Sequence, residues 1–301
     1  MSKNKVNANS LGHFLLLFVQ PIFMTSNIAI ARGAFGNVPP VSLAFSRWLL
    51  VFLIIFPFIY QSILKKKKYF KKESWRLTFL AATGYVGCGA LPYISGLTST
   101  VTNMSIIYAL SPIFIVLLSA YIYKERLKTF QYGGVILSLF GVSFIIFKGN
   151  LNNFINLNFT TGDIWIFGAA ISWSLFSIFL INWKSKFSII ERFTIMSLVG
   201  SIILIPFLII EHLYFLPTAF NTTYIEFSLL AALFPGIIAF LMYTKLQQVV
   251  GASVAGLTVY LMPIYGSIYG FVLFSENLFN YHFYGAVLVL LGIFLAKKKY
   301  K

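Results

Sequence analysis

The sequence predicts an all-α membrane protein of ten transmembrane helices, arranged as two inverted five-helix repeats with both termini in the cytoplasm. Three observations lead to this fold class: an apolar composition, ten apolar runs, and a motif that recurs 151 residues later. Of the 301 residues, 59% are hydrophobic and 10% are charged, whereas a soluble domain is about 45–50% apolar. The net charge of +16 does not indicate a nucleic-acid partner, because the basic residues lie in loops between apolar runs.

A helix needs about 20 apolar residues to cross a bilayer, and ten runs reach or approach that length. In chain order we expect spans at 11–31, 41–64, 75–96, 101–122, 129–147, 162–182, 188–210, 226–248, 252–273 and 280–296. The first run follows Lys3 and Lys5 and ends in an Ala29-Ile30-Ala31 step that resembles a signal-peptidase site. We interpret it as an uncleaved span, because its length suits a full crossing and its removal would break the count.

The connections between these runs are too short to fold independently. The three longest connections are Lys65 to Ser74 after the second span, Gly149 to Thr161 between the halves, and Glu211 to Tyr224 after the seventh span. We therefore expect one transmembrane domain made of two units, a first repeat at 1–148 and a second at 149–301.

The basic residues segregate to alternate loops. Counting from a cytoplasmic N terminus, the loops on that side collect 20 of the 23 Lys and Arg residues, as expected of cytoplasmic loops. The opposite side receives Arg32, Arg47 and Lys148. An odd number of spans would mix the two groups, so the segregation supports ten spans and places both termini in the cytoplasm.

The repeated motif spans two apolar runs and the short loop between them. Its first copy contains Pro112, Glu125, Leu127, Gly134 and Gly141, which recur as Pro263, Glu276, Leu278, Gly285 and Gly292. Because each half has five spans, the second copy crosses the membrane in the opposite sense. The two glutamates therefore fall on opposite faces and cannot form a catalytic pair, whereas inverted halves supply the geometry of alternating access.

Four segments carry a family resemblance: Pro40–Trp48 with its arginine; Leu110-Ser111-Pro112 through Glu125; Gly162-Asp163-Ile164 through Trp173; and Gly251-Ala252-Ser253 with Leu261-Met262-Pro263 and Glu276. In this order and spacing, the chain resembles the ten-span EamA-type transporters of the drug/metabolite transporter superfamily over almost its whole length. The resemblance implies a carrier of small organic metabolites, often amino acids and frequently exported, in a bacterial inner membrane.

Two prolines mark the centre of the repeat. A helical rise of about 1.5 Å per residue places Pro112 roughly 20 Å from Glu125, inside the hydrocarbon core, and Pro263 mirrors it. Proline disrupts the bond to the carbonyl four residues earlier, so the carbonyls of Tyr108 and Val259 would be freed. We expect a hinge or a central cavity at this level; packing kinks satisfied by neighbouring helices are the alternative.

Cavity-lining candidates are polar or aromatic residues near the span centres: Gln20, Tyr85, Tyr108, Ser111, Trp173 and Tyr260. Tyr and Trp offer an apolar face and one polar tip, which suits a small amphipathic solute; ordinary aromatic packing is the competing interpretation. Arg47, at the outer end of a span, would bind a carboxylate through its planar fork. Its side chain would otherwise snorkel to the interface.

Several functions are disfavoured. Cys88 is the only cysteine, the three histidines are scattered, and no HExxH or GxSxG motif occurs, so we expect no enzyme, cofactor or metal site. No Asp or Glu lies at a span centre, which argues against proton-coupled export of cations and predicts a neutral or zwitterionic solute.

Two other classes of membrane protein account for part of this pattern. A flippase for polar lipid headgroups would need a lateral opening lined by basic residues. A structural or receptor-like membrane protein would explain the spans but not the inverted duplication. The expected partners are a small-molecule substrate and the lipid bilayer, and the sequence is compatible with a monomer.

Overall fold

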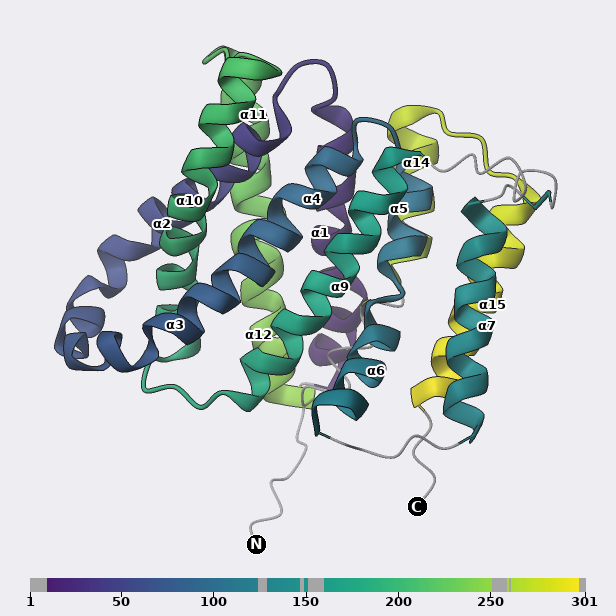
Figure 1. The fold of residues 1–301 in the computed structure, drawn as a ribbon, viewed down its shortest axis with the longest axis horizontal. Helices are drawn as coiled ribbons and strands as arrows, with labels where there is room; N and C mark the ends of the chain where they lie inside the picture. The colour runs from purple at the N-terminus through teal and green to yellow at the C-terminus, as the bar shows by residue number, and fades with distance from the viewer. Residues whose placement is uncertain are drawn as a thin grey trace, which may run out of the picture.

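The chain folds into a bundle of helices (Figure 1). The computed structural model describes residues 10–123, 129–146, 149–150, 160–250, 259 and 261–297. In these ranges the helices group into ten spans, as predicted: α1 (Ser10–Gly33); α2 (Pro40–Lys65); α3 (Phe70–Ala81), η2 (Ala82–Gly87) and α4 (Cys88–Ser95); α5 (Val101–Tyr108) and α6 (Ser111–Tyr123); α7 (Thr129–Ile146); α9 (Thr161–Asn182); α10 (Ile189–Tyr214); α11 (Thr222–Ala231), η3 (Ala232–Ile238) and α12 (Ala239–Val250); α14 (Met262–Phe274); and α15 (Asn280–Lys297).

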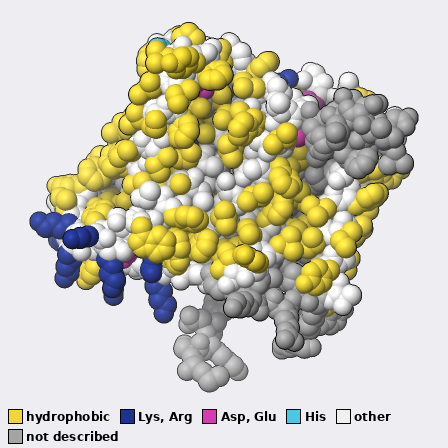
Figure 2. Space-filling model, in the orientation of Figure 1, with side chains coloured by type: hydrophobic (Ala, Val, Ile, Leu, Met, Phe, Trp, Pro, Cys, Tyr) yellow, Lys and Arg dark blue, Asp and Glu magenta, His cyan; other side chains and the backbone are white. Residues whose placement is uncertain are grey.

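Length and composition support a membrane setting. Within the described ranges, five stretches are long and apolar enough to cross a bilayer without interruption: Pro40–Lys65, Lys67–Ser95, Thr161–Leu180, Ile189–Tyr214 and Thr222–Tyr243. The start of α1 and the end of α15 lie at the same edge of the bundle (Figure 1). Lysine and arginine side chains gather at that edge near α2 and α3, whereas hydrophobic side chains cover most of the visible face (Figure 2). These basic side chains and the two described chain ends lie on one side of the bundle, the side that the loop charges predict to be cytoplasmic; we call it the cytoplasmic edge and the opposite side the outer edge.

Local capping explains where several helices begin. Thr160 and Asp163 form a reciprocal capping box at α9, and Ser188 and Glu191 form another at α10. The Asn221 side chain accepts the backbone N–H of Tyr224 at the start of α11. Each cap satisfies N–H groups that have no partner within the helix.

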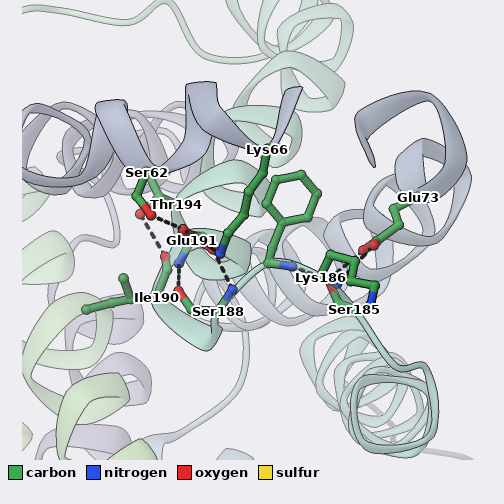
Figure 3. Close-up of polar contacts among 10 residues, drawn as sticks. Ser62, Lys66, Glu73, Ser185, Lys186, Ser188, Ile190, Glu191 and Thr194 are labelled. Carbon is green, nitrogen blue, oxygen red and sulfur yellow. Dashed lines mark hydrogen bonds and ion pairs between the residues drawn. The ribbon is translucent and has the colours of Figure 1, made fainter. Parts of the chain in front are cut away.

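At the cytoplasmic edge, two carboxylates fasten α10 and its preceding loop to α2 and α3 (Figure 3). Lys66 Nζ lies 2.6 Å from the Glu191 carboxylate, which also accepts the backbone N–H of Ser188. Glu73 on α3 accepts the backbone N–H of Lys186 at 3.0 Å. These contacts fix the cytoplasmic end of α2 beside the start of α10.

At the outer edge, two more carboxylates cap helices from a distance in sequence. Glu211 accepts the backbone N–H groups of Val41 and Ser42, each at 2.8 Å. Glu276 accepts the N–H of Val101 at 2.7 Å and that of Thr102 at 3.1 Å. A carboxylate there satisfies orphan N–H groups and complements the positive end of the helix dipole. Glu276 therefore stabilises a helix end; its repeat partner, Glu125, lies outside the described residues.

Among the contacts between the two halves, α5 of the first repeat packs against α14 of the second. At Gly266 on α14, an added Cβ would lie 1.8 Å from Ser105 Oγ on α5, so only glycine permits this approach. A second pair, α7 and α15, stands at one side of the bundle (Figure 1). There a Cβ at Gly285 would lie 2.2 Å from Ile145 Cγ1. Small residues thus permit the close approach of both of these helix pairs.

The helix is interrupted just before Pro112. α5 ends at Tyr108 and α6 begins at Ser111, which makes Pro112 its second residue. The Tyr108 carbonyl, expected to be freed by the proline, accepts the Ser111 hydroxyl. Pro263 is likewise the second residue of α14. The structure thus places both prolines in the first turn of a helix, and their hinge role stays a prediction.

A second pair of irregularities follows the repeat. The third and eighth spans each contain a π-helical segment, η2 at Ala82–Gly87 and η3 at Ala232–Ile238. Shifting η2 by the 151-residue offset places it inside η3, with Gly84 matching Pro235. π-Helical turns are rare and frequently occur at functional sites.

Candidate functional site

A cavity of about 300 Å³ lies at the centre of the bundle, with side chains from both repeats in its wall. Its volume is at the lower end of the range for small-molecule pockets, about 300–1,000 Å³. The first repeat contributes residues from α1, α2, η2, α4 and α5, and the second contributes residues from α9, α10, η3, α12 and α14. The two π-helical segments thus face the same space, through Gly84 and Tyr85 on η2 and Pro235 and Gly236 on η3.

Most of the wall is aromatic or apolar. The aromatic lining residues are Trp48, Tyr85, Tyr108, Trp173, Phe176, Phe193, Phe240 and Tyr243. Several form one contiguous group: the Trp48 and Tyr85 rings lie 4.3 Å apart, and Phe193 and Phe240 stack at 3.6 Å between centroids. Such a wall suits the apolar body of a small solute.

Five sequence-predicted candidates line this cavity: Gln20, Arg47, Tyr85, Tyr108 and Trp173. Their role in binding a solute stays a prediction. Tyr260 lies outside the described residues.

Ser111 does not line the cavity. Its side chain is fully buried and donates to the Tyr108 carbonyl, and its own carbonyl accepts the Ser174 hydroxyl at 2.8 Å. Ser111 was selected because it is polar and near a span centre, but the interrupted helix consumes its hydroxyl locally. It therefore supports the position of Tyr108 in the wall.

Arg47 is turned into the protein and does not snorkel. The residue is only 5% exposed, and its guanidinium donates to Asn27 Oδ1 at 2.6 Å and to the Pro235 carbonyl at 3.3 Å. It also lies 4.2 Å from the centroid of the Trp48 ring. All of these partners are neutral, so the cation is buried without a countercharge.

Asn27, Trp48 and Arg192 are among the lining residues that sequence reasoning missed. Asn27 orients Arg47, and the Trp48 indole N–H donates to the Tyr85 carbonyl at 2.7 Å. Arg192, in the first turn of α10, was counted with the cytoplasmic loops, although it is only 9% exposed and lines the cavity. Its position after Ile189 and Ile190, inside an apolar run, was the signal available in the sequence.

The charge of the lining is one-sided. Arg47 and Arg192 are the cationic residues of the cavity, and within the described ranges no Asp or Glu lines it. Five of the described acidic residues are held by helix ends, loop backbone, hydroxyls or a lysine: Glu73, Asp163, Glu191, Glu211 and Glu276. Glu226 is exposed. We also find no group of His, Cys, Asp and Glu able to hold a metal among the residues the structure describes.

Comparison with known proteins agrees with this architecture. The model of the EamA-like transporter family matches residues 11–147 and 160–297, thus most of the chain. The chain belongs to the EamA-like transporter family. It is therefore a multi-pass membrane transporter of the drug/metabolite transporter superfamily and not an enzyme.

Relatives of this EamA-like transporter occur in archaea and bacteria. An uncharacterized transporter of Archaeoglobus fulgidus is 26% identical, with the alignment covering 97% of this chain and 99% of that protein. The uncharacterized transporter YyaM of Bacillus subtilis is 24% identical, over 95% of this chain and 93% of its own. One solved crystal structure matches with a TM-score of 0.61 at 18% identity, covering 95% and 96% of the two chains, which shows a shared fold.

Proposed function

We propose that this EamA-like transporter carries small organic metabolites that have a carboxylate, with zwitterionic amino acids and their relatives as the first candidates. Transport would proceed by alternating access through the central cavity, in the export direction, across the inner membrane of a bacterium. The observation that carries the proposal is Arg47, a buried cation in the wall of an aromatic cavity, whose hydrogen-bond partners Asn27, Tyr93 and the Pro235 carbonyl are all neutral.

A carboxylate suits the geometry of this site. Arginine presents a planar fork of donors that matches two carboxylate oxygens, and such charge-assisted bonds are stronger than neutral ones. Asn27 and Trp48 hold the guanidinium from two sides. The side chain is thereby preorganised, which lowers the entropy cost of binding.

The remainder of the lining limits the solute further. Trp173 and Phe176 lie 5.6 Å apart between ring centroids and add to the apolar wall. Because no acidic residue lines the described part of the cavity, a solute whose only charge is positive would find no countercharge. These features support the predicted exclusion of cationic drugs. A mostly aromatic wall also favours a metabolite carrier over a lipid flippase.

The inverted repeat supports alternating access. At the outer edge, Glu276 holds the N terminus of α5, and Gly266 lets α14 approach the same helix closely. A carrier must break and remake such contacts on the two faces in turn. The outer contact between α5 and α14 is therefore the candidate for one of its two gates.

The test is reconstitution of the full chain into proteoliposomes with a panel of labelled amino acids and related metabolites. We expect uptake that saturates and that falls at least about tenfold in Trp173→Ala and Tyr108→Ala, because each change removes lining surface. Trp165→Ala is the matched control, since Trp165 lies on the same helix as Trp173 and is 43% exposed. Unchanged transport in both cavity variants would remove the cavity assignment.

A further inference from the structure

Two buried guanidinium groups share the cavity. Arg47 and Arg192 are 5% and 9% exposed, and each has an Nε atom that is buried without a hydrogen-bond partner. Tyr85, in the π-helical segment η2, interacts electrostatically with both groups. The two arginines come from opposite repeats, Arg47 from α2 and Arg192 from α10.

Burying a cation is costly unless it is paired. Arg47 donates hydrogen bonds to Asn27, Tyr93 and the Pro235 carbonyl, and Arg192 donates to the Leu180 carbonyl at 3.4 Å. Every one of these acceptors is neutral. The charge that would balance two guanidinium groups is not supplied by the described lining.

One acidic residue acts on Arg192 from outside the cavity. Glu73 interacts with it electrostatically, but its oxygens accept the Lys186 N–H and the Ser185 hydroxyl. Glu191, next to Arg192 in sequence, is paired with Lys66 (Figure 3). Neither carboxylate lines the cavity, so two positive charges remain directed at its contents.

We propose that the cavity selects a small organic anion: an aromatic or apolar body bearing a carboxylate that is bound by Arg47 and favoured further by the positive charge of Arg192 in the same cavity. This inference rests on the proposed function and narrows it, because a zwitterion would bring an ammonium group into a cavity that already carries two cations. The aromatic wall holds the body, and the guanidinium groups hold the charge. Substrate specificity is then set by net charge.

The test compares four ligands with one phenyl body and different charge: phenylacetate, phenylalanine, 2-phenylethanol and 2-phenylethylamine. Binding to the detergent-solubilised full chain is followed by intrinsic tryptophan fluorescence, since Trp48 and Trp173 line the cavity. We expect phenylacetate to bind at least about tenfold more tightly than each of the others, the effect of one charge-assisted hydrogen bond. This comparison uses the unmodified protein and needs no variant to fold.

Variants then assign the effect to the two arginines. Arg47→Gln and Arg192→Gln are each expected to weaken phenylacetate binding by about 10- to 100-fold and to leave 2-phenylethanol binding within about twofold. Arg76→Gln is the matched control, because Arg76 also has a buried Nε without a partner but does not line the cavity. Arg76→Gln should leave the binding affinities for phenylacetate and for 2-phenylethanol unchanged.

Two results would overturn the anion proposal: phenylalanine binding as tightly as phenylacetate, or phenylacetate binding that is unaffected in Arg192→Gln. Either would leave the proposed carrier of carboxylate-bearing metabolites standing, provided that labelled amino acids still enter proteoliposomes. Failure of every labelled solute to enter, whatever its charge, would instead contradict the proposed function.

Discussion

Replacing Glu276 by glutamine should release the outer gate. The carboxylate accepts the N–H groups of Val101 and Thr102 and also the Thr102 hydroxyl, at 2.7, 3.1 and 2.8 Å. Both donor residues, Val101 and Thr102, are buried, at 0% and 1% exposure. Glutamine keeps the shape but has one acceptor oxygen, so its NH₂ group would face a backbone or hydroxyl donor. A hydrogen bond to a charged group contributes about 1.5–3 kcal/mol, and Glu276 is half-exposed, so we expect a loss of about 2 kcal/mol, or roughly 30-fold in the open-to-closed ratio.

The lone cysteine provides the assay. Cys88 lines the cavity and is buried, so a membrane-impermeant methanethiosulfonate added outside right-side-out vesicles reaches it only when the outer side opens. The labelling rate in Glu276→Gln should rise by about 10- to 30-fold, the gain in open population. Glu226→Gln is the control, because Glu226 is exposed and near the same membrane face. Equal rates in wild type and Glu276→Gln, or the same rise in the control, would refute the assignment of Glu276 as a gate contact.

Two further substitutions test the joints between the repeats. Gly266→Ala would place a Cβ 1.8 Å from Ser105 Oγ and should destabilise the protein by about 1–3 kcal/mol in thermal unfolding. Gly133→Ala is the control and should not destabilise the protein, because nothing lies within 4 Å of the added atom. Equal melting temperatures for the two variants would contradict the close approach of α5 and α14. Pro112→Ala restores an N–H that competes with the Ser111 hydroxyl for the Tyr108 carbonyl, and it should lower the transport flux several-fold without loss of stability. Pro57→Ala, on the exposed side of α2, is the control. Normal flux in Pro112→Ala would show that the helix interruption between α5 and α6 is dispensable.

The sequence was a good guide to the spans because lipid imposes a strong constraint on length and polarity. The predicted span at 162–182 corresponds to α9 at Thr161–Asn182, and that at 41–64 to α2 at Pro40–Lys65. These helix ends coincide with capping residues and loop charges that can be recognised in the sequence itself. The inverted arrangement followed from the same constraint, since the number of crossings fixes the side of each loop.

The cavity was only partly predictable. Trp173 and Tyr108 were identified because their central position in a span argues against an interfacial aromatic belt. Arg192 was missed because loop charges and buried charges look alike in a sequence. Arg47 was identified as a candidate, but the sequence did not decide whether its side chain points into the cavity or toward the membrane interface. Direction depends on partners such as Asn27 and Pro235, which are 20 and 188 residues away, and no local pattern indicates such contacts.

The paired π-helical segments have a consequence for the history of the chain. The 151-residue offset of the repeated motif places η2 inside η3. Each half therefore carries the same rare irregularity at the same point of its own third span. We infer that the irregularity was present in the five-helix unit before that unit was duplicated, and that both copies have kept it since.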